Sequence, residues 1–139
     1  MIVVDTNVIA ELMRSEPNGA VLHWSLAQPG ADLYTTAITL AEILYGVERL
    51  PAGRRQDELR AAAADVFTTF DDKVLPFDAG AAAHYALVVD GRERLGRPID
   101  GFDAQIAAVC RAHDAALATR NVKDFEHTGV EVVDPWVGP

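Results

Sequence analysis

Short apolar segments alternate with longer segments of helical periodicity along this chain, and this alternation limits the possible folds more than any other feature. The segments that are short and apolar enough to be strands are residues 1–4, 32–36, 74–75, 116–119 and 130–133. Longer segments with helical spacing separate the first four of them. Strands that alternate with helices form a parallel sheet covered on both faces. We therefore expect an α/β fold in which helices flank a central parallel β-sheet.

The helical segments carry apolar side chains three and four residues apart. The spacing is clearest over residues 37–50, where the main apolar face is formed by Leu40, Ile43, Leu44 and Val47. The other predicted helices cover residues 6–13, 18–27, 54–70, 78–95 and 103–113. Because no linker, repeat or low-complexity segment interrupts these elements, we expect a single domain over residues 1–139.

Cysteine content and hydropathy indicate a cytoplasmic protein. The lone Cys110 cannot form an internal disulfide, and its apolar helical surroundings predict a small buried residue in a reducing compartment. No apolar run approaches the roughly 20 residues that a membrane-spanning helix needs. The N-terminal MIVVDTN also lacks the cationic start and apolar stretch of a signal peptide. We expect no membrane contact.

The charge balance is unusual for a protein that binds nucleic acid. The chain has 21 acidic residues against 12 Lys and Arg, a formal net charge of −9 and a pI near 4.7. Nucleic-acid binders usually carry a basic patch. The acids therefore form either an ordinary solvated surface or a cluster that binds a cation, and their positions in the sequence bear on this choice.

Three acids, Asp5, Glu42 and Asp103, lie at strand ends or on helices without a basic neighbour. Asp5 directly follows the first strand, where an aspartate can also serve as a helix N-cap. Glu42 can be an exposed helical glutamate, but such residues normally have Lys or Arg three or four positions away. The residues at those spacings are Ile38, Thr39, Tyr45 and Gly46 around Glu42, and Ile99, Asp100, Ile106 and Ala107 around Asp103.

The carboxyl edge of the predicted sheet is where these acids should meet, because sites in open α/β sheets lie beyond the carboxyl ends of the strands. Two carboxylates about 4 Å apart repel by about 4 kcal/mol at an effective dielectric near 20. Several of them stay ionised together only beside a compensating charge. Oxygen ligands suit Mg²⁺ or Mn²⁺. Zinc is not expected, since the histidines are scattered at positions 23, 84, 113 and 127.

The whole chain resembles the PIN-domain endoribonucleases of the VapC group, and within it the plasmid-stability and FitB-like branch. The matching segments are Asp5-Thr6-Asn7, Thr39-Leu40-Ala41-Glu42, Phe102-Asp103-Ala104-Gln105-Ile106-Ala107-Ala108, Thr119-Arg120-Asn121 with Asp124-Phe125, and Asp134-Pro135-Trp136. Each segment alone is weakly specific, whereas the set in this order and spacing is specific.

The resemblance implies a PIN-like fold and a ribonuclease that depends on Mg²⁺ or Mn²⁺. It assigns Asp5 and Asp103 as the most direct metal ligands and Glu42 as the glutamate beside them, all three being catalytic. The family's fourth position, often acidic, falls here on Asn121. This departure leaves two accessory ligands open, the neutral oxygen of Asn121 or Asp124 through water, with Asp100 as an outer-sphere helper.

The resemblance also implies partners. It predicts a cognate VapB-like antitoxin that occupies the active-site groove and supplies the DNA-binding part of the complex. We expect a homodimer that assembles further with the antitoxin, and an RNA substrate. The basic residues expected to hold flanking phosphates are Arg14, Arg49, Arg92, Arg94, Arg97 and Arg120.

Two other functions are compatible with parts of the sequence. A phosphotransfer module, either a phosphatase or a receiver domain, also places an Asp after a parallel strand. The phosphatase requires a second Asp where Asn7 stands, and the receiver requires a late Lys where Arg120 stands. A PIN-like protein that only binds partners would not need Asp5, Glu42 and Asp103 to be intact together. Both alternatives are therefore less favoured.

Overall fold

The computed structural model describes residues 1–137, and a parallel sheet runs through its centre. The strands are β1 (Ile2–Val4), β2 (Leu33–Thr36), β3 (Val74–Leu75), β4 (Ala116–Ala118) and β5 (Val132–Val133). Their order is β3-β2-β1-β4-β5, and every pairing is parallel. The predicted α/β architecture with a central parallel sheet is confirmed.

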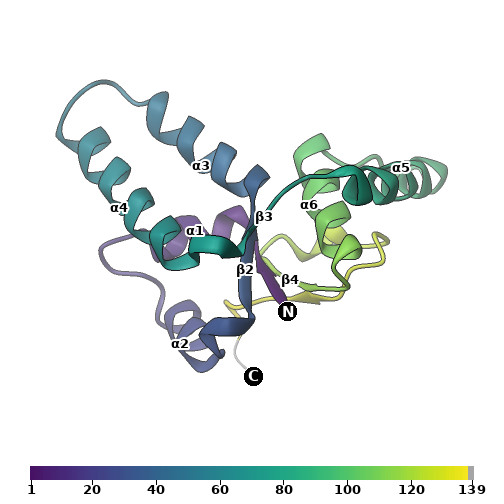
Figure 1. The fold of residues 1–139 in the computed structure, drawn as a ribbon, viewed down its shortest axis with the longest axis horizontal. Helices are drawn as coiled ribbons and strands as arrows, with labels where there is room; N and C mark the ends of the chain where they lie inside the picture. The colour runs from purple at the N-terminus through teal and green to yellow at the C-terminus, as the bar shows by residue number, and fades with distance from the viewer. Residues whose placement is uncertain (138–139) are drawn as a thin grey trace.

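The helices cover both faces of this sheet (Figure 1). They are α1 (Thr6–Leu12), α2 (Gly19–Ala27), α3 (Ala37–Glu48), α4 (Arg54–Phe70), α5 (Ala79–Arg94) and α6 (Gly101–Ala112), with short 3-10 turns η1 (Gly30–Asp32), η2 (Asp71–Lys73) and η3 (Val122–Phe125). Helices α3 and α4 run side by side on one side of the molecule, and α5 packs along α6 on the other.

Two hydrophobic clusters lie on opposite faces of the sheet. Val3 belongs to the cluster that also contains Leu117 and Ile106, beneath α5 and α6. Its neighbour Val4 belongs to the other cluster, which packs with residues of α1, α2, α3 and α4. Successive strand residues point to opposite faces. The short apolar strand at the N-terminus therefore supplies both cores, which explains why it contains no polar residue before Asp5.

Most element boundaries agree with the sequence prediction within two residues. Helix α6 begins at Gly101 and not at Asp103, because the Asp100 carboxylate accepts hydrogen bonds from the N–H groups of Phe102 and Asp103. Asp100 is thus the N-cap of this helix. Cys110 is fully buried, as expected.

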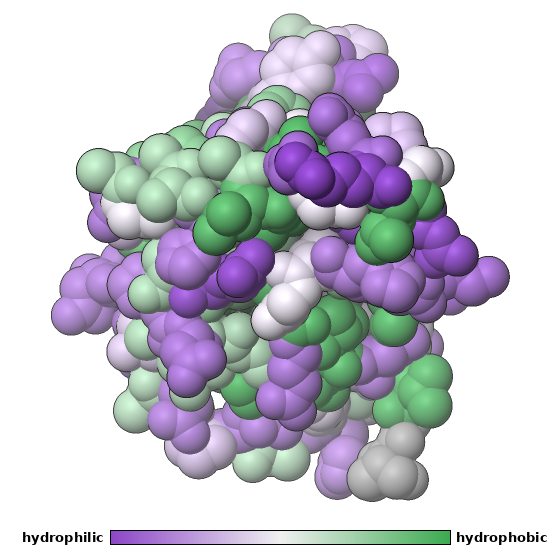
Figure 2. Space-filling model, turned by 90° about the vertical axis from the view of Figure 1, so that its right-hand side faces the viewer, coloured by the Kyte–Doolittle hydropathy of each residue, from purple (hydrophilic) through white to green (hydrophobic). Residues whose placement is uncertain are grey.

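The apolar face predicted for residues 37–50 is only partly buried. Ile43 and Val47 are in the core, whereas Leu44 is 47% exposed and its neighbour Tyr45 is 68% exposed. Phe102 at the start of α6 is 52% exposed. Elsewhere the surface is mixed: on the face drawn in Figure 2, hydrophilic residues are interspersed with smaller hydrophobic patches. No helix within residues 1–137 is long and apolar enough to cross a membrane.

A matched pair of leucines tests the position of the core. Leu117 is fully buried in β4, and Leu26 in α2 is 77% exposed. Leu117→Ala should lower the free energy of unfolding by about 2–5 kcal/mol, because it removes buried methyl groups and leaves a cavity in the central sheet. Leu26→Ala should change it by less than about 0.5 kcal/mol. Urea denaturation of the two variants measures both values, and equal effects would contradict the assigned core.

Candidate active site

Asp5 lies at the carboxyl end of the central strand, and both of its carboxylate oxygens are held. Oδ1 accepts the backbone N–H of Thr6 at 2.8 Å, so Asp5 caps α1. Oδ2 accepts the Thr119 hydroxyl at 2.7 Å and the Asn7 amide at 3.3 Å. Asp5 is only 3% exposed. The helix cap and the candidate metal ligand are therefore the same residue, and the two interpretations of Asp5 do not exclude each other.

Glu42 reaches the same edge of the sheet from α3. Its Oε1 accepts the Thr6 hydroxyl at 2.9 Å, and the Thr6 and Thr39 hydroxyl oxygens lie 3.2 Å apart. Thr39 is buried, and its backbone N–H donates to the hydroxyl of Thr36, the N-cap of α3. A chain of hydroxyl groups therefore joins the end of β2 to the carboxylate of Glu42.

Asp103 stands in the first turn of α6, where the positive end of the helix dipole favours a carboxylate. Asp100 precedes it as the N-cap. Asp124 belongs to η3, the turn that follows β4, and Asn121 is the residue before this turn. Both Asn121 and Asp124 are exposed, and Asn121 donates its backbone N–H to the Thr119 hydroxyl at 3.1 Å. All the predicted site residues thus come from segments at the carboxyl edge of the sheet.

The electrostatics of Asp103 reflect the other acids at this edge of the sheet. Burial first, and then the charges of Asp5, Asp100, Asp124 and Glu42, together raise the pKa of Asp103 to about 7. Burial also raises the pKa of Asp5 and of Glu42. Among residues 1–137, the groups that oppose this rise at Asp5 and Glu42 are hydrogen-bond donors, Thr119 and Thr6, and not basic side chains. The site is an acidic cluster without a compensating cation from the chain.

The donor set fits a hard divalent cation. Mg²⁺ and Mn²⁺ prefer oxygen ligands. Asp5, Glu42 and Asp103 offer carboxylate oxygens, and Asn121 offers an amide oxygen. Within the described residues, no three acidic, His or Cys groups stand close enough to bind one ion as they are. Binding would therefore require the side chains to move inward, against a repulsion that the cation itself removes.

The hydroxyl and amide groups around the acids were not assigned a role from sequence. Thr119 and Asn7 hold Asp5, while Thr6 holds Glu42. Asn7 also joins the two sides of the site, because its amide donates to Thr119 at 3.0 Å and its oxygen accepts the N–H of Arg120 at 3.1 Å. The sequence signal for these polar residues is that they lie within three residues of a predicted strand end, in the segments Asp5-Thr6-Asn7 and Thr119-Arg120-Asn121.

The basic residues that were expected to face RNA lie in different surroundings. Arg92 is 6% exposed and donates to three backbone carbonyl groups, so it is part of the fold and not of an RNA surface. Arg94 and Arg97 pair with Asp90 and Glu126. Arg120 is exposed beside the site and its guanidinium lies 5.2 Å from the centre of the Trp136 ring.

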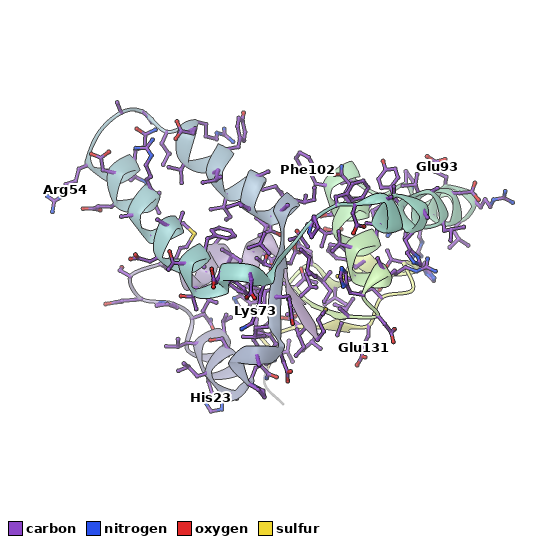
Figure 3. All side chains as sticks on the ribbon, in the orientation of Figure 1. His23, Arg54, Lys73, Glu93, Phe102 and Glu131 are labelled. Atoms are coloured by element: carbon purple, nitrogen blue, oxygen red, sulfur yellow. The ribbon has the colours of Figure 1, made fainter. Side chains whose placement is uncertain are left out.

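Hydrophobic side chains border the acidic cluster on its α3 and α6 side. Ala41, Tyr45 and Phe102 line one hollow together with Glu42. Figure 3 shows Phe102 at the start of α6. A second hollow runs from Glu42 to Arg14. The carboxylates therefore adjoin both apolar and basic surface.

Comparison with known proteins gives the same family throughout. The family described as "PIN domain" matches residues 2–131. The chain is 40% identical to the protein named VapC ribonuclease Y4jK of Sinorhizobium fredii, over 98% of both chains. It is 36% identical to Toxin FitB of Neisseria gonorrhoeae, over 98% of this chain and 99% of that one. A solved structure titled "Structure of FitAB bound to IR36 DNA fragment" superposes with a TM-score of 0.93 at 35% identity, covering 100% of this chain and 98% of that one.

The raised pKa of Asp103 predicts how stability depends on pH. In metal-free protein, the folded state keeps the Asp103 proton up to about pH 7, whereas the unfolded chain releases it near 3.8. The free energy of unfolding should therefore fall as the pH rises between these values. Asp103→Asn removes this titration and should make the decrease in the free energy of unfolding smaller. Asp90→Asn, on the surface of α5, should leave the decrease unchanged. Urea denaturation in chelator at several pH values measures the slope; equal slopes for wild type and Asp103→Asn would contradict the prediction.

Proposed function

The chain belongs to the PIN domain family, and on that premise we propose that it is a divalent-metal-dependent endoribonuclease and the toxin of a toxin–antitoxin pair. The observation that carries the proposal is that Asp5, Glu42, Asp103 and Asp124 come from four separate elements to one edge of the sheet, where none of them forms an ion pair within residues 1–137. A protein gains nothing in stability from gathering like charges at one edge of a sheet. Their placement is accounted for by a bound cation, and Mg²⁺ or Mn²⁺ suits these oxygen donors best.

In this proposal Asp5, Glu42 and Asp103 are the catalytic metal ligands, and Asn121 or Asp124 completes the set with Asp100 in the outer sphere. When bound, the cation supplies positive charge at the scissile phosphate and makes a water molecule a better nucleophile. In the metal-free site the chain's own hydroxyl groups orient two of the ligands. Thr119 fixes Oδ2 of Asp5, and Thr6 fixes Oε1 of Glu42, so each carboxylate presents its remaining lone pairs in a set direction.

Arg120 is the best-placed basic side chain for RNA. Its backbone is tied to Asn7 at the edge of the site, and its side chain packs on Trp136, which restricts its rotamers. It forms no ion pair with an acid of residues 1–137. A guanidinium held in this way is available to a phosphate next to the cleaved bond. The substrate class is RNA, and exposed loops are its most readable parts.

The partner we propose is a small antitoxin whose basic side chain enters the acidic cluster. A guanidinium binds carboxylates in a bidentate manner and would replace the metal charge. The exposed Tyr45 and Phe102, which line a hollow together with Glu42, provide apolar surface for the rest of such a segment. A solved relative is titled as a FitAB complex with DNA, which supports a partner that binds DNA. We propose a homodimer that assembles further with this antitoxin, and a cytoplasmic location.

Removal of single ligands tests the metal site. Asp5→Asn and Asp103→Asn should each lower the rate of Mg²⁺-dependent RNA cleavage by more than about 100-fold, because each removes charge that holds the ion, an effect of several kcal/mol. Glu42→Gln should also abolish most cleavage, and so should a chelator. The measurement is the initial rate of cleavage of a structured RNA pool with Mg²⁺ or Mn²⁺.

Asp57→Asn is the matched control, since Asp57 is an exposed acid of α4 and its loss leaves the site untouched. Cleavage at the wild-type rate by Asp103→Asn would show that this site is wrongly assigned. Intact-mass measurement with a small phosphodonor separates a phosphotransfer module from a nuclease. A phosphate adduct on Asp5 without RNA cleavage would favour the former, and metal binding without cleavage would favour a binding protein.

The toxin proposal predicts a growth phenotype. Expression of the wild-type chain should arrest growth, whereas Asp5→Asn, made in equal amount, should not. Co-expression of the small reading frame adjacent to the gene should restore growth, and its product should co-purify with the chain. Harmless expression with no co-purifying product would reject the toxin role and leave a nuclease of another purpose.

A further inference from the structure

Arg92 is a buried cation that forms no ion pair with any residue of the described chain, 1–137. It lies in the last turn of α5 and is 6% exposed. Its Nε donates to the carbonyl oxygen of Arg97 at 2.7 Å, and its Nη1 donates to those of Asp124 at 2.8 Å and Glu126 at 3.0 Å. Burying a charge is costly unless hydrogen bonds compensate it. The positions of the three carbonyl groups that compensate the Arg92 charge indicate what its burial achieves.

The three carbonyl groups belong to two segments that carry acids of the site. Arg97 lies in the loop between α5 and α6, three residues before Asp100, the N-cap of α6. Asp124 and Glu126 lie in and directly after η3. The guanidinium thus fixes the start of α6, with Asp103, relative to the turn that carries Asp124. A surface ion pair between Arg97 and Glu126 at 3.3 Å joins the same segments but is exposed and therefore weak.

Geometry and not charge is the means by which Arg92 can act on the site. Burial and other carboxylates account for the raised pKa of Asp103, and the charge of Arg92 does not contribute to it. The planar guanidinium supplies donors at Nε and Nη1 that point in different directions. A lysine in its place keeps the charge but has all its donors on one atom.

We propose that Arg92 is a positioning residue that sets the distance between Asp124 and Asp103 and thereby makes Asp124 part of the metal site. The proposal rests on the function proposed above. The proposal also selects between the two accessory residues. Asp124 is favoured because its carbonyl oxygen accepts a hydrogen bond from Arg92, whereas Asn121 accepts none from it. Residues that support metal ligands in this way typically contribute 10- to 100-fold to metal affinity.

Mn²⁺ affinity of the full-length chain provides the test, measured from the electron paramagnetic resonance signal of free Mn²⁺ and without RNA. Arg92→Lys should raise the Mn²⁺ dissociation constant by about 10-fold, with an unchanged circular dichroism spectrum. Arg94→Lys, on the exposed end of the same helix, should leave it unchanged. Asp124→Ala should weaken binding to a similar extent. The double variant Arg92→Lys/Asp124→Ala should be no weaker than the weaker single variant, because both changes remove the same contribution.

Each result decides for or against the inference. A folded Arg92→Lys protein with wild-type Mn²⁺ affinity would overturn it, and so would losses that multiply in the double variant. If Arg92→Lys does not fold, the Asp124→Ala variant decides. Unchanged Mn²⁺ affinity in Asp124→Ala overturns the inference. A loss of Mn²⁺ affinity in Asp124→Ala, without such a loss in Asn121→Ala, supports it. Wild-type protein whose Mn²⁺ binding is absent, or is unaffected by Asp103→Asn, would instead reject the proposed function itself.

Discussion

Electrostatic repulsion among carboxylates at one edge of the sheet is the constraint on which the rest of this structure depends. The parallel arrangement brings the ends of β1, β2 and β4 together, and the acids that follow them arrive at one place. Asp103 experiences the result most strongly, because its partial burial and four other carboxylates act in the same direction. The remainder of the fold must hold these groups in place without neutralising them.

The chain meets this requirement with neutral donors. Threonine hydroxyls hold Asp5 and Glu42, and the Asn7 amide connects the two segments that meet at Asp5. A lysine or arginine at any of these positions would hold a carboxylate more strongly. It would also neutralise the negative charge that attracts a metal ion. Arg92 also leaves the acids unneutralised, because its guanidinium donates to backbone carbonyl groups and not to carboxylates.

The fold class could be predicted from sequence because it depends on local patterns, and so could the position of the acids at strand ends and on helices. Apolar runs, helical spacing and acids at strand ends are visible within a few residues of each other. The order of strands is not local, and neither is the pairing of Thr119 with Asp5 across 114 positions. The burial of Arg92 was missed for the same reason, since its partners lie in loops without periodicity. Leu44 has the spacing of a core residue, and periodicity alone does not reveal that the packing of residues 1–137 leaves it 47% exposed.

The central position of β1 has a consequence for how the protein is made. β1 leaves the ribosome before the other four strands of the sheet, yet it lies in the middle of the sheet and pairs with β4, where Ile2 is opposite Ala116. The Asp5 carboxylate therefore has no Thr119 hydroxyl to accept until β4 has been translated, and contacts so distant in sequence are slow to form. A chain interrupted before β4 lacks two of the five strands and the donor that fixes Asp5. The order of the strands thus delays assembly of the acidic cluster until β4 has been synthesised.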